Sequence, residues 1–297
     1  MVGRNLTLVV AILLLVVTIL SAQEEEKKEQ FGWLNDLVGS LNLTQNRYSS
    51  NWTQGGENSF AWKGQLDTKF EDNQPKTNWR NTLKFTYGQV KQGEDDIRKS
   101  DDELKFESVF KLKSGRHLNP YVAVNFETQV TRGYLYTTKD GVDVKEPVAD
   151  FLSPAFLRES LGLGYKPSEV FMTRLGFSVK HTIVKDESFH YNDQDFAIRP
   201  RYGNRPDQAV RTETGIESTT DVVKKLEKNV IFTSKLELFS SFENFSAVDV
   251  NWDNTLTAKF LKYFALNFNV RLFYDEDILK ELQVKQSFGF GVTYAFF

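Results

Sequence analysis

The chain has 297 residues, no Cys and a formal net charge of −3. The lack of Cys excludes disulfides, thiolate catalysis, Cys-based metal sites and a lipid-anchored N-terminus, and a charge near zero gives no sign of nucleic-acid binding. A mean hydropathy of −0.43 argues against a helical membrane protein. It does not argue against a membrane β-barrel, because half of each barrel strand faces a polar lumen.

The N-terminal region contains one long apolar run, over residues 6–20, behind Arg4. The run is shorter than the roughly 20 residues that a membrane-spanning helix needs. A basic start, a short apolar core and the small pair Ser21-Ala22 are typical of a signal peptide, which we expect to cover residues 1–22. An uncleaved anchor helix is the alternative. We expect residues 23–40 to form a periplasmic tether with a short amphipathic helix from Phe31 onward.

From Leu41 to the end, apolar residues alternate with polar ones, as in strands that have one apolar face. The rows cover residues 60–70, 79–87, 104–112, 122–126, 157–165, 171–179, 230–238, 248–260, 264–274 and 284–296, with weaker rows at 41–49 and 210–216. The pattern predicts an all-β fold over residues 41–297, an antiparallel up-and-down transmembrane β-barrel of about twelve strands, with ten or fourteen as alternatives.

Charged side chains occupy the positions between the apolar ones. A basic side chain that faced lipid would cost roughly 2–4 kcal/mol at mid-bilayer, so we expect these charges to face a lumen. The lumen-lining candidates are Lys63, Arg80, Lys84, Lys105, Glu107, Glu127, Arg174, Arg211, Glu213, Lys235, Glu237, Asp253, Arg271 and Lys285. On the apolar face, Glu159 and His181 are the main exceptions. A soluble β-sandwich would also alternate, but it explains neither the signal peptide nor the aromatic C-terminus.

The expected connections alternate in length, as in an up-and-down barrel. Short turns are expected near residues 71–75, 114–117, 166–168, 221–227 and 261–263, and longer loops near 91–102, 132–155, 185–208, 241–247 and 275–281. Short turns belong on the periplasmic side of an outer-membrane barrel. Both termini would then be periplasmic.

The last strand ends on aromatic residues, Tyr294, Phe296 and Phe297. A C-terminal strand of this kind resembles the closing strand of bacterial outer-membrane barrels, whose end the barrel assembly machinery reads. We therefore interpret these residues as an assembly signal, in which Phe296 shares the apolar face and Phe297 lies one residue beyond it.

The segment from Asn51 to Asn58 reads Asn-Trp-Thr-Gln-Gly-Gly-Glu-Asn. It resembles the N-W-x-x-G-G-x-N signature of an uncharacterised family of outer-membrane barrels from Bacteroidota-type bacteria, carried here by Asn51, Trp52, Gly55, Gly56 and Asn58. The stretch Lys99-Ser100-Asp101-Asp102 lies where that family has K-x-D-D. The resemblance covers residues 40–130 best and implies an outer-membrane barrel without implying an activity.

The sequence predicts no catalytic, cofactor-binding or metal-binding residues, and hence no enzyme. His181 faces the predicted lipid side while its neighbour Ser178 does not, which disfavours a barrel lipase, and the acids and His190 of loop 185–208 are more typical of a solvated loop than of a protease site. We expect a narrow, porin-like channel for small solutes, with a structural or partner-binding barrel as the alternative and a hydrolase last.

The expected partners are outer-membrane lipid, the assembly machinery, and an unknown protein at the long loops. A count of fourteen basic and nine acidic inward residues predicts a mild preference for anions.

Overall fold

The computed structural model describes residues 29–49, 51, 56–139, 142–185, 191–192, 199–200, 202–205 and 207–296. The predicted signal peptide, residues 23–28 of the predicted tether, Trp52, Gly55 and Phe297 lie outside the described residues. Among the residues that are described, no helix is long and apolar enough to cross a membrane.

Twelve long strands form a closed antiparallel barrel in the order β1-β16-β15-β14-β13-β12-β9-β8-β5-β4-β3-β2. Their bounds are β1 Gly32–Asn46, β2 Ser59–Asn73, β3 Thr77–Gln92, β4 Arg98–Leu112, β5 Leu118–Thr128, β8 Ala155–Tyr165, β9 Phe171–Ile183, β12 Val210–Glu227, β13 Val230–Ser241, β14 Val248–Phe260, β15 Phe264–Asp275 and β16 Leu279–Ala295. The predicted twelve-stranded barrel is confirmed. Two small hairpins, β6 Gly133–Lys139 with β7 Val142–Ala149 and β10 Tyr191–Asn192 with β11 Arg199–Pro200, lie in the connections.

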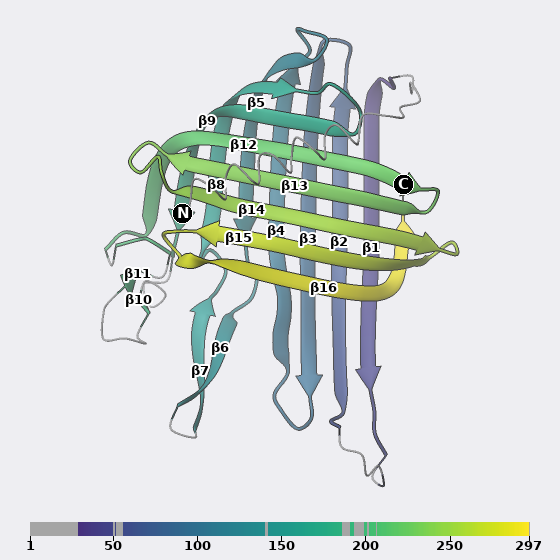
Figure 1. Cartoon of the computed structure of the whole chain (residues 1–297), viewed down its shortest axis with the longest axis vertical. Coiled ribbons are helices and arrows are strands. Elements are labelled where there is room, and N and C mark those ends of the chain that lie inside the picture. The colour runs from purple at the N-terminus through teal and green to yellow at the C-terminus, as the bar shows by residue number, and fades with distance from the viewer. Residues whose placement is uncertain are drawn as a thin grey trace.

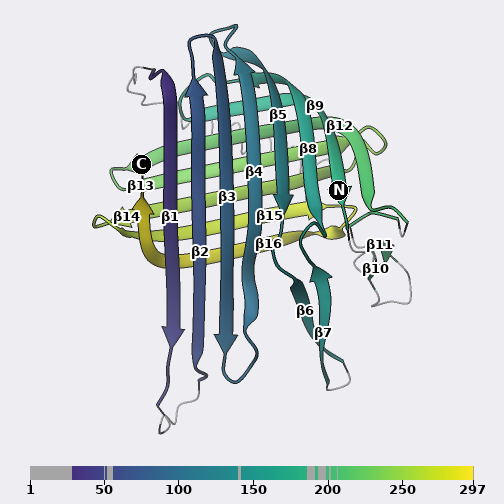
Figure 2. The ribbon, with the colours of Figure 1, turned by 180° about the vertical axis from the view of Figure 1, so that it is seen from behind.

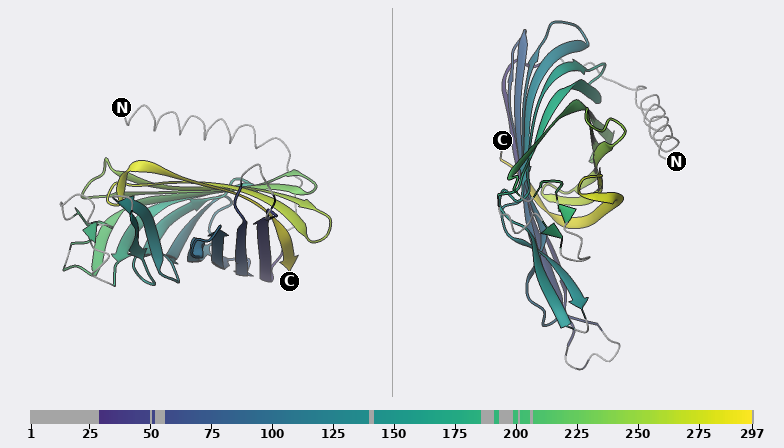
Figure 3. Two further views of the ribbon diagram at one scale, coloured as in Figure 1. Left: turned by 90° about the horizontal axis from the view of Figure 1, so that it is seen from below. Right: turned by 90° about the vertical axis from the view of Figure 1, so that its left-hand side faces the viewer.

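The barrel has two walls whose strands cross each other. In Figures 1 and 2, β1 to β4 run along the long axis of the view while β13 to β16 run across it. Strands of a closed barrel tilt from its axis by roughly 35–45°, so strands on opposite walls cross when seen from the side. Figure 3 shows the two walls from other directions.

The outer face of the barrel is apolar and exposed. Leu161, Phe177 and Phe288 keep 59%, 62% and 70% of their surface exposed. Aromatic rings cluster outside the strands near the short turns, where Phe290 stacks on Phe260 with ring centroids 5.5 Å apart. An exposed apolar band with aromatic residues near its rims is typical of a barrel in lipid.

The backbones of β8 and β9 approach each other closely at a pair of glycines. Gly162 and Gly176 are register partners. A Cβ at Gly162 would lie 2.1 Å from the Leu175 carbonyl oxygen, and one at Gly176 would lie 2.3 Å from the Leu161 carbonyl oxygen. Only glycine fits this close approach of two backbones, which is the usual role of a strand glycine at a barrel corner.

The connections at one end of the barrel have two to five residues, and four of the six at the other end are longer. Residues 74–76, 113–117, 166–170, 228–229 and 261–263 join strands at one end, and residues 47–58, 93–97, 129–154, 184–209, 242–247 and 276–278 join them at the other. Four predicted connections are wrong in most of their residues. Residues 221–227 belong to β12, and most residues of the predicted connections 71–75, 91–102 and 275–281 belong to the flanking strands, because these strands continue past their apolar rows.

The predicted short helix at the end of the tether is also wrong. Residues 32–46 form strand β1, which pairs with β2 along its whole length. The residues just before it are held at the short-turn end of the barrel. The Glu29 carboxylate accepts a hydrogen bond from Lys113 Nζ at 2.5 Å, and Asn73 Nδ2 donates to the Gln30 carbonyl at 2.6 Å. The hydrogen bond from Lys113 lowers the pKa of Glu29.

Candidate functional site: a lumen crossed by ion pairs

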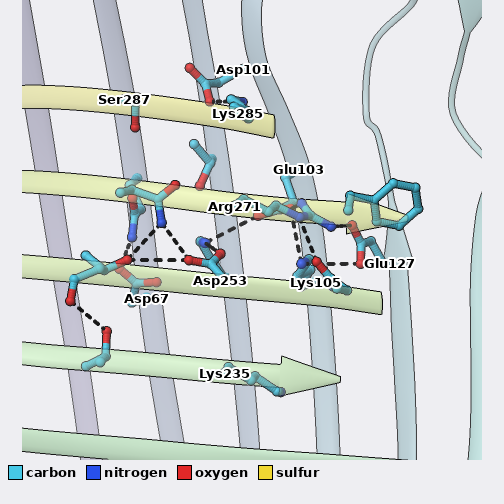
Figure 4. Close-up of a pocket in the computed structure, with 18 of the residues that line it drawn as sticks. Asp67, Asp101, Glu103, Lys105, Glu127, Lys235, Asp253, Arg271, Lys285 and Ser287 are labelled. Atoms are coloured by element: carbon cyan, nitrogen blue, oxygen red, sulfur yellow. Dashed lines mark hydrogen bonds and ion pairs between the residues drawn. The ribbon is translucent and has the colours of Figure 1, made fainter. Parts of the chain in front are cut away.

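A cavity of about 1240 Å³ lies between the two walls of the barrel and is lined by charged side chains from both. Figure 4 shows its central part, where residues of β2, β4 and β5 on one wall face residues of β13 to β16 on the other. The alternation of each strand explains this placement, because every second residue points to the same face.

Arg271 of β15 joins the two walls at the centre of the cavity. Its Nη1 donates to Glu103 of β4 at 2.5 Å, and its Nη2 donates to Glu127 of β5 at 3.0 Å. Its Nε donates to Asn251 Oδ1 at 2.8 Å, so the guanidinium is held in position on its own wall as well. Lys105 pairs with the same two carboxylates at 3.2 and 3.3 Å. The planar guanidinium suits this task, since it presents several donors in a fixed geometry.

Lys84 of β3 makes a second bridge between the two walls. Its ammonium is 3.4 Å from Glu103 and 3.8 Å from Asp253 of β14, so it connects opposite walls. Asn269 Nδ2 donates to Asp253 at 2.6 Å and fixes that carboxylate.

Glu107 of β4 makes a third bridge between the two walls. It pairs with Arg174 of β9 and, at 3.2 Å, with Lys235 of β13. Arg174 is only 2% exposed, so its guanidinium is buried against the wall of the lumen. On the β13 side, Glu237 lies 3.7 Å from Arg158 and 3.8 Å from Lys235.

A fourth cluster lies toward the long-loop end, around Lys180 of β9. Its ammonium is 2.6 Å from Asp249, 3.0 Å from Asp275 and 3.9 Å from Glu213. Arg211 extends the cluster by pairing with Glu213 at 3.0 Å. Lys180 is 5% exposed, so its charge is balanced by buried carboxylates rather than by water.

Ten of the fourteen predicted lumen residues line the cavity itself: Lys63, Lys84, Lys105, Glu107, Glu127, Lys235, Glu237, Asp253, Arg271 and Lys285. Arg174, Arg211 and Glu213 lie in the adjoining clusters. Arg80 lies opposite Glu71 in the β2–β3 register, four residues before Lys84.

Several acidic residues that line the lumen were not among the predicted lumen residues. Asp101 and Glu103 continue the row of Lys105 and Glu107 toward the start of β4. Asp101 lies in the predicted loop 91–102, and Glu103 lies between that loop and the apolar row that begins at Leu104. Nine basic side chains line the cavity: Lys63, Lys84, Lys105, Arg158, Lys180, Lys235, Lys259, Arg271 and Lys285. Eleven acidic ones do so: Asp67, Asp101, Asp102, Glu103, Glu107, Glu127, Asp221, Glu237, Asp249, Asp253 and Asp275. The lining of this cavity therefore lacks the predicted basic excess on which the expected anion preference depends.

The two aspartates of the K-x-D-D stretch make different contacts. The Asp102 carboxylate accepts hydrogen bonds from the backbone N–H groups of Val130 and Thr131 at 2.9 and 2.8 Å, and from Lys99 Nζ at 3.0 Å. It thereby holds the start of the β5–β8 connection. Asp101 instead binds Lys63 and Lys285 inside the lumen, at 3.3 and 2.6 Å.

The described part of the N-W-x-x-G-G-x-N segment organises the β1–β2 loop. Asn58 Oδ1 accepts the backbone N–H of Tyr48 at 2.7 Å, and Asn51 Oδ1 accepts the Ser49 hydroxyl at 2.6 Å. Gly56 has a φ of 121°, a conformation that favours glycine, and its face lies against the Tyr48 ring.

The two predicted exceptions on the apolar face meet each other. His181 Nε2 lies 3.8 Å from Glu159, and its Nδ1 lies 2.9 Å from the Thr212 hydroxyl. Ser178 is buried on the lumen side of the same strand, away from His181. Within the described ranges, no group of three or more His, Asp or Glu side chains is arranged to hold a metal ion.

At the C-terminus, Tyr294 and Phe296 pack edge to face with centroids 4.9 Å apart. The Phe296 N–H donates to the Leu37 carbonyl at 2.8 Å, and the Phe296 ring covers Gly39 of β1. These contacts place the end of β16 where the barrel closes.

A closed barrel with an exposed apolar exterior and a charged interior belongs to the class of membrane β-barrels. Two families, each described as a protein of unknown function, match the chain: DUF3078 over residues 43–134 and DUF481 over residues 155–296. No curated protein matches it.

Solved structures similar to the chain include the translocator domain of the autotransporter NalP from Neisseria meningitidis, at 9% identity and a TM-score of 0.40, covering 99% of this chain and 96% of that one. The COG4313 outer membrane channel from Pseudomonas putida F1 has 11% identity and a TM-score of 0.40, covering 92% and 98%. The beta domain of the Bordetella autotransporter BrkA has 12% identity and a TM-score of 0.33, covering 88% and 98%.

Proposed function

We propose that the protein is an outer-membrane barrel that passes small polar solutes through a narrow, charged lumen. The short turns and both chain ends would face the periplasm and the longer connections the outside, as in bacterial barrels. Lipid and the barrel assembly machinery are its partners in this proposal, and its N-W-x-x-G-G-x-N segment supports the inference that it is a barrel of the Bacteroidota-type family.

The observation that carries the proposal is the bridge made by Arg271 to Glu103 and Glu127 on the opposite wall, within a cavity of about 1240 Å³. A barrel of twelve strands is wider than the eight-stranded kind that side chains fill, and narrower than open porins of 16–18 strands. Side chains that cross such a lumen leave a passage for small solutes only.

Single-channel recording in planar bilayers tests this function. We expect a conductance well below that of a general porin, and a higher conductance in an Arg271→Ala variant, because the substitution removes the side chain that spans the lumen. Lys280→Ala is the control, since Lys280 lies at the exposed start of β16 and is absent from the cavity lining.

Two results would contradict the proposal that the protein is a channel. One is a wild-type conductance as large as that of an open porin, and the other is an Arg271→Ala conductance equal to that of the wild type and of Lys280→Ala. Replacing Lys84 as well should enlarge the passage further, because Lys84 bridges the same walls through Asp253.

A structural or partner-binding barrel with a sealed lumen is the second candidate. The burial of Arg174 and Lys180, 2% and 5% exposed, favours it because these ion-paired side chains fill part of the lumen. A sealed barrel would show no conductance in the wild type and would retain a protein partner, bound at the longer connections, after crosslinking in cells. We propose no catalytic activity for the protein.

A further inference from the structure

The barrel closes by an unusually short seam. β1 and β16 pair over five residues, from Val38 with Ala295 to Asn42 with Gly291, whereas β1 and β2 pair over fifteen. The next shortest pairing, β4 with β5, has eight. In Figure 1, β16 runs across the barrel and turns alongside β1 only near its C-terminal end.

The rest of β16 therefore has a free edge. Leu279 and residues 283–290 of β16 pair with β15 on one side and have no partner on the β1 side, and residues 43–46 of β1 pair only with β2. Unpaired backbone is costly in hydrocarbon, so such an edge in a membrane barrel needs either a gap that admits water or a bound molecule.

The central cavity reaches this edge. Its lining includes Lys285 and Ser287, which face the lumen, and also Val284 and Phe288, which face outward and are 59% and 70% exposed. Trp62 of β2, the register partner of Leu43 of β1, also lines the cavity. The cavity therefore extends to the part of the wall where β1 and β16 are unpaired.

The inner side of the gap carries positive charge. The ammonium groups of Lys63 and Lys285 share a single carboxylate, that of Asp101, at 3.3 and 2.6 Å. Asn42, next to Lys63 in the register, has a buried side-chain oxygen with no hydrogen-bond partner among the described residues. Two cations with one anion leave a site suited to a second anionic group.

We propose that the β1–β16 seam is a lateral opening that binds an anionic amphiphile, with its acidic head between Lys63 and Lys285 and its acyl chain lying past Val284 and Phe288 into the bilayer. The apolar outer lip, the gap and the paired ammonium groups match the three parts of such a molecule. The opening lies in the wall, whereas the head-group site lies in the lumen beside Asp101.

Fluorescence of 11-(dansylamino)undecanoate, added to the whole protein in phosphatidylcholine nanodiscs with empty nanodiscs as blank, tests the proposal. We expect saturable binding that the double variant Lys63→Ala with Lys285→Ala weakens roughly tenfold or more, since each ammonium makes a charge-assisted contact. Asp101→Asn should tighten binding, because it removes the competing carboxylate. A variant that merely folded poorly would not bind more tightly.

Competing ligands define the head group. Dodecanoate and dodecyl phosphate should both displace the probe, and the stronger of the two identifies a carboxylate or a phosphate head, whereas dodecyltrimethylammonium should not displace it. Equal displacement by the cationic ligand, or weaker binding by Asp101→Asn, would overturn the site.

A reversible covalent crosslink between β1 and β16 tests the opening itself. Continuing the seam register places Thr44 opposite Gly289, and the chain has no Cys of its own. Thr44→Cys with Gly289→Cys, joined by a short bis-methanethiosulfonate, should block probe binding until a reductant cleaves the bridge. The control is Ser40→Cys with Thr293→Cys, a pair already in register, which should leave binding unchanged.

If the bridged protein binds the probe as the unbridged one does, the opening is refuted. Ion conductance should be the same with the bridge in place or cleaved. A failure of this proposal is therefore distinguishable from a failure of the channel, which the Arg271→Ala recording tests.

Discussion

At the scale of single residues, the seam depends on a glycine. A Cβ at Gly291 would lie 2.3 Å from the Leu41 carbonyl oxygen, which belongs to the backbone and cannot move aside. A Cβ at Gly289 would lie 3.0 Å from Asn42 Oδ1, the end of a side chain that can rotate. Two glycines two residues apart on one strand thus differ in what they tolerate.

We expect Gly291→Ala to impair closure of the barrel and Gly289→Ala to be tolerated. The measurement is the fraction of each variant that migrates as the compact, unheated form on a gel after refolding into detergent. Equal folded fractions for the two variants would show that the five-residue seam does not limit closure.

The charges of the lumen were largely predictable from residue spacing, because a period of two places alternate residues on one face. The partner of each charge was not predictable. Arg271 and Glu103 are 168 residues apart in the chain, and only the closure of the barrel brings them together. Asp101 was missed because the row of apolar residues in its strand starts after it.

At the scale of elements, two strands were hard to recognise, each for a physical reason. In β1, Val38 faces the lumen side and Leu37 the outside, so apolar residues on both faces imitate the spacing of a helix. In β12, the outward positions 218 and 220 carry hydroxyl side chains, and Thr220 bonds the Thr173 hydroxyl at 2.9 Å. A polar outer face hides the alternation that marks the other strands.

The C-terminal element should be the most sensitive to truncation. We expect Phe296→Ala to reduce assembly more than deletion of Phe297, because Phe296 packs on Tyr294 and covers Gly39 of the neighbouring strand. Deletion of residues 23–28 should have the smallest effect, since β1 starts after them. The amount of each variant in the outer membrane, measured by immunoblot, checks the order, and any other order would show that β16 is not the assembly signal.

At the scale of the whole molecule, the barrel combines an apolar exterior with an interior whose charges are nearly balanced. The walls are held together by ion pairs that involve β3, β4 and β5 on one side and β13, β14 and β15 on the other. Breaking one partner of a buried pair leaves an uncompensated charge, which costs about 3–5 kcal/mol. These bridges therefore stabilise the barrel, and in the proposed channel they also limit the width of the passage.

The balance of charges predicts weak ion selectivity. Because acidic side chains slightly outnumber basic ones in the cavity lining, we expect a small preference for cations, measured as the reversal potential across a KCl gradient. Arg271→Ala should strengthen that preference, since it leaves Glu103 and Glu127 with less compensation. A strong anion preference in the wild type would contradict the assignment of lumen residues.

The most direct test of the membrane-barrel assignment combines two measurements. Membrane fractionation shows where the protein is found, and a denaturing gel compares its mobility with and without heating. Closed barrels leave no strand edge for detergent to attack except at a seam. We predict that the protein is found in the outer-membrane fraction and runs faster unheated than boiled. Recovery in the soluble periplasmic fraction, with one mobility under both conditions, would contradict a membrane barrel.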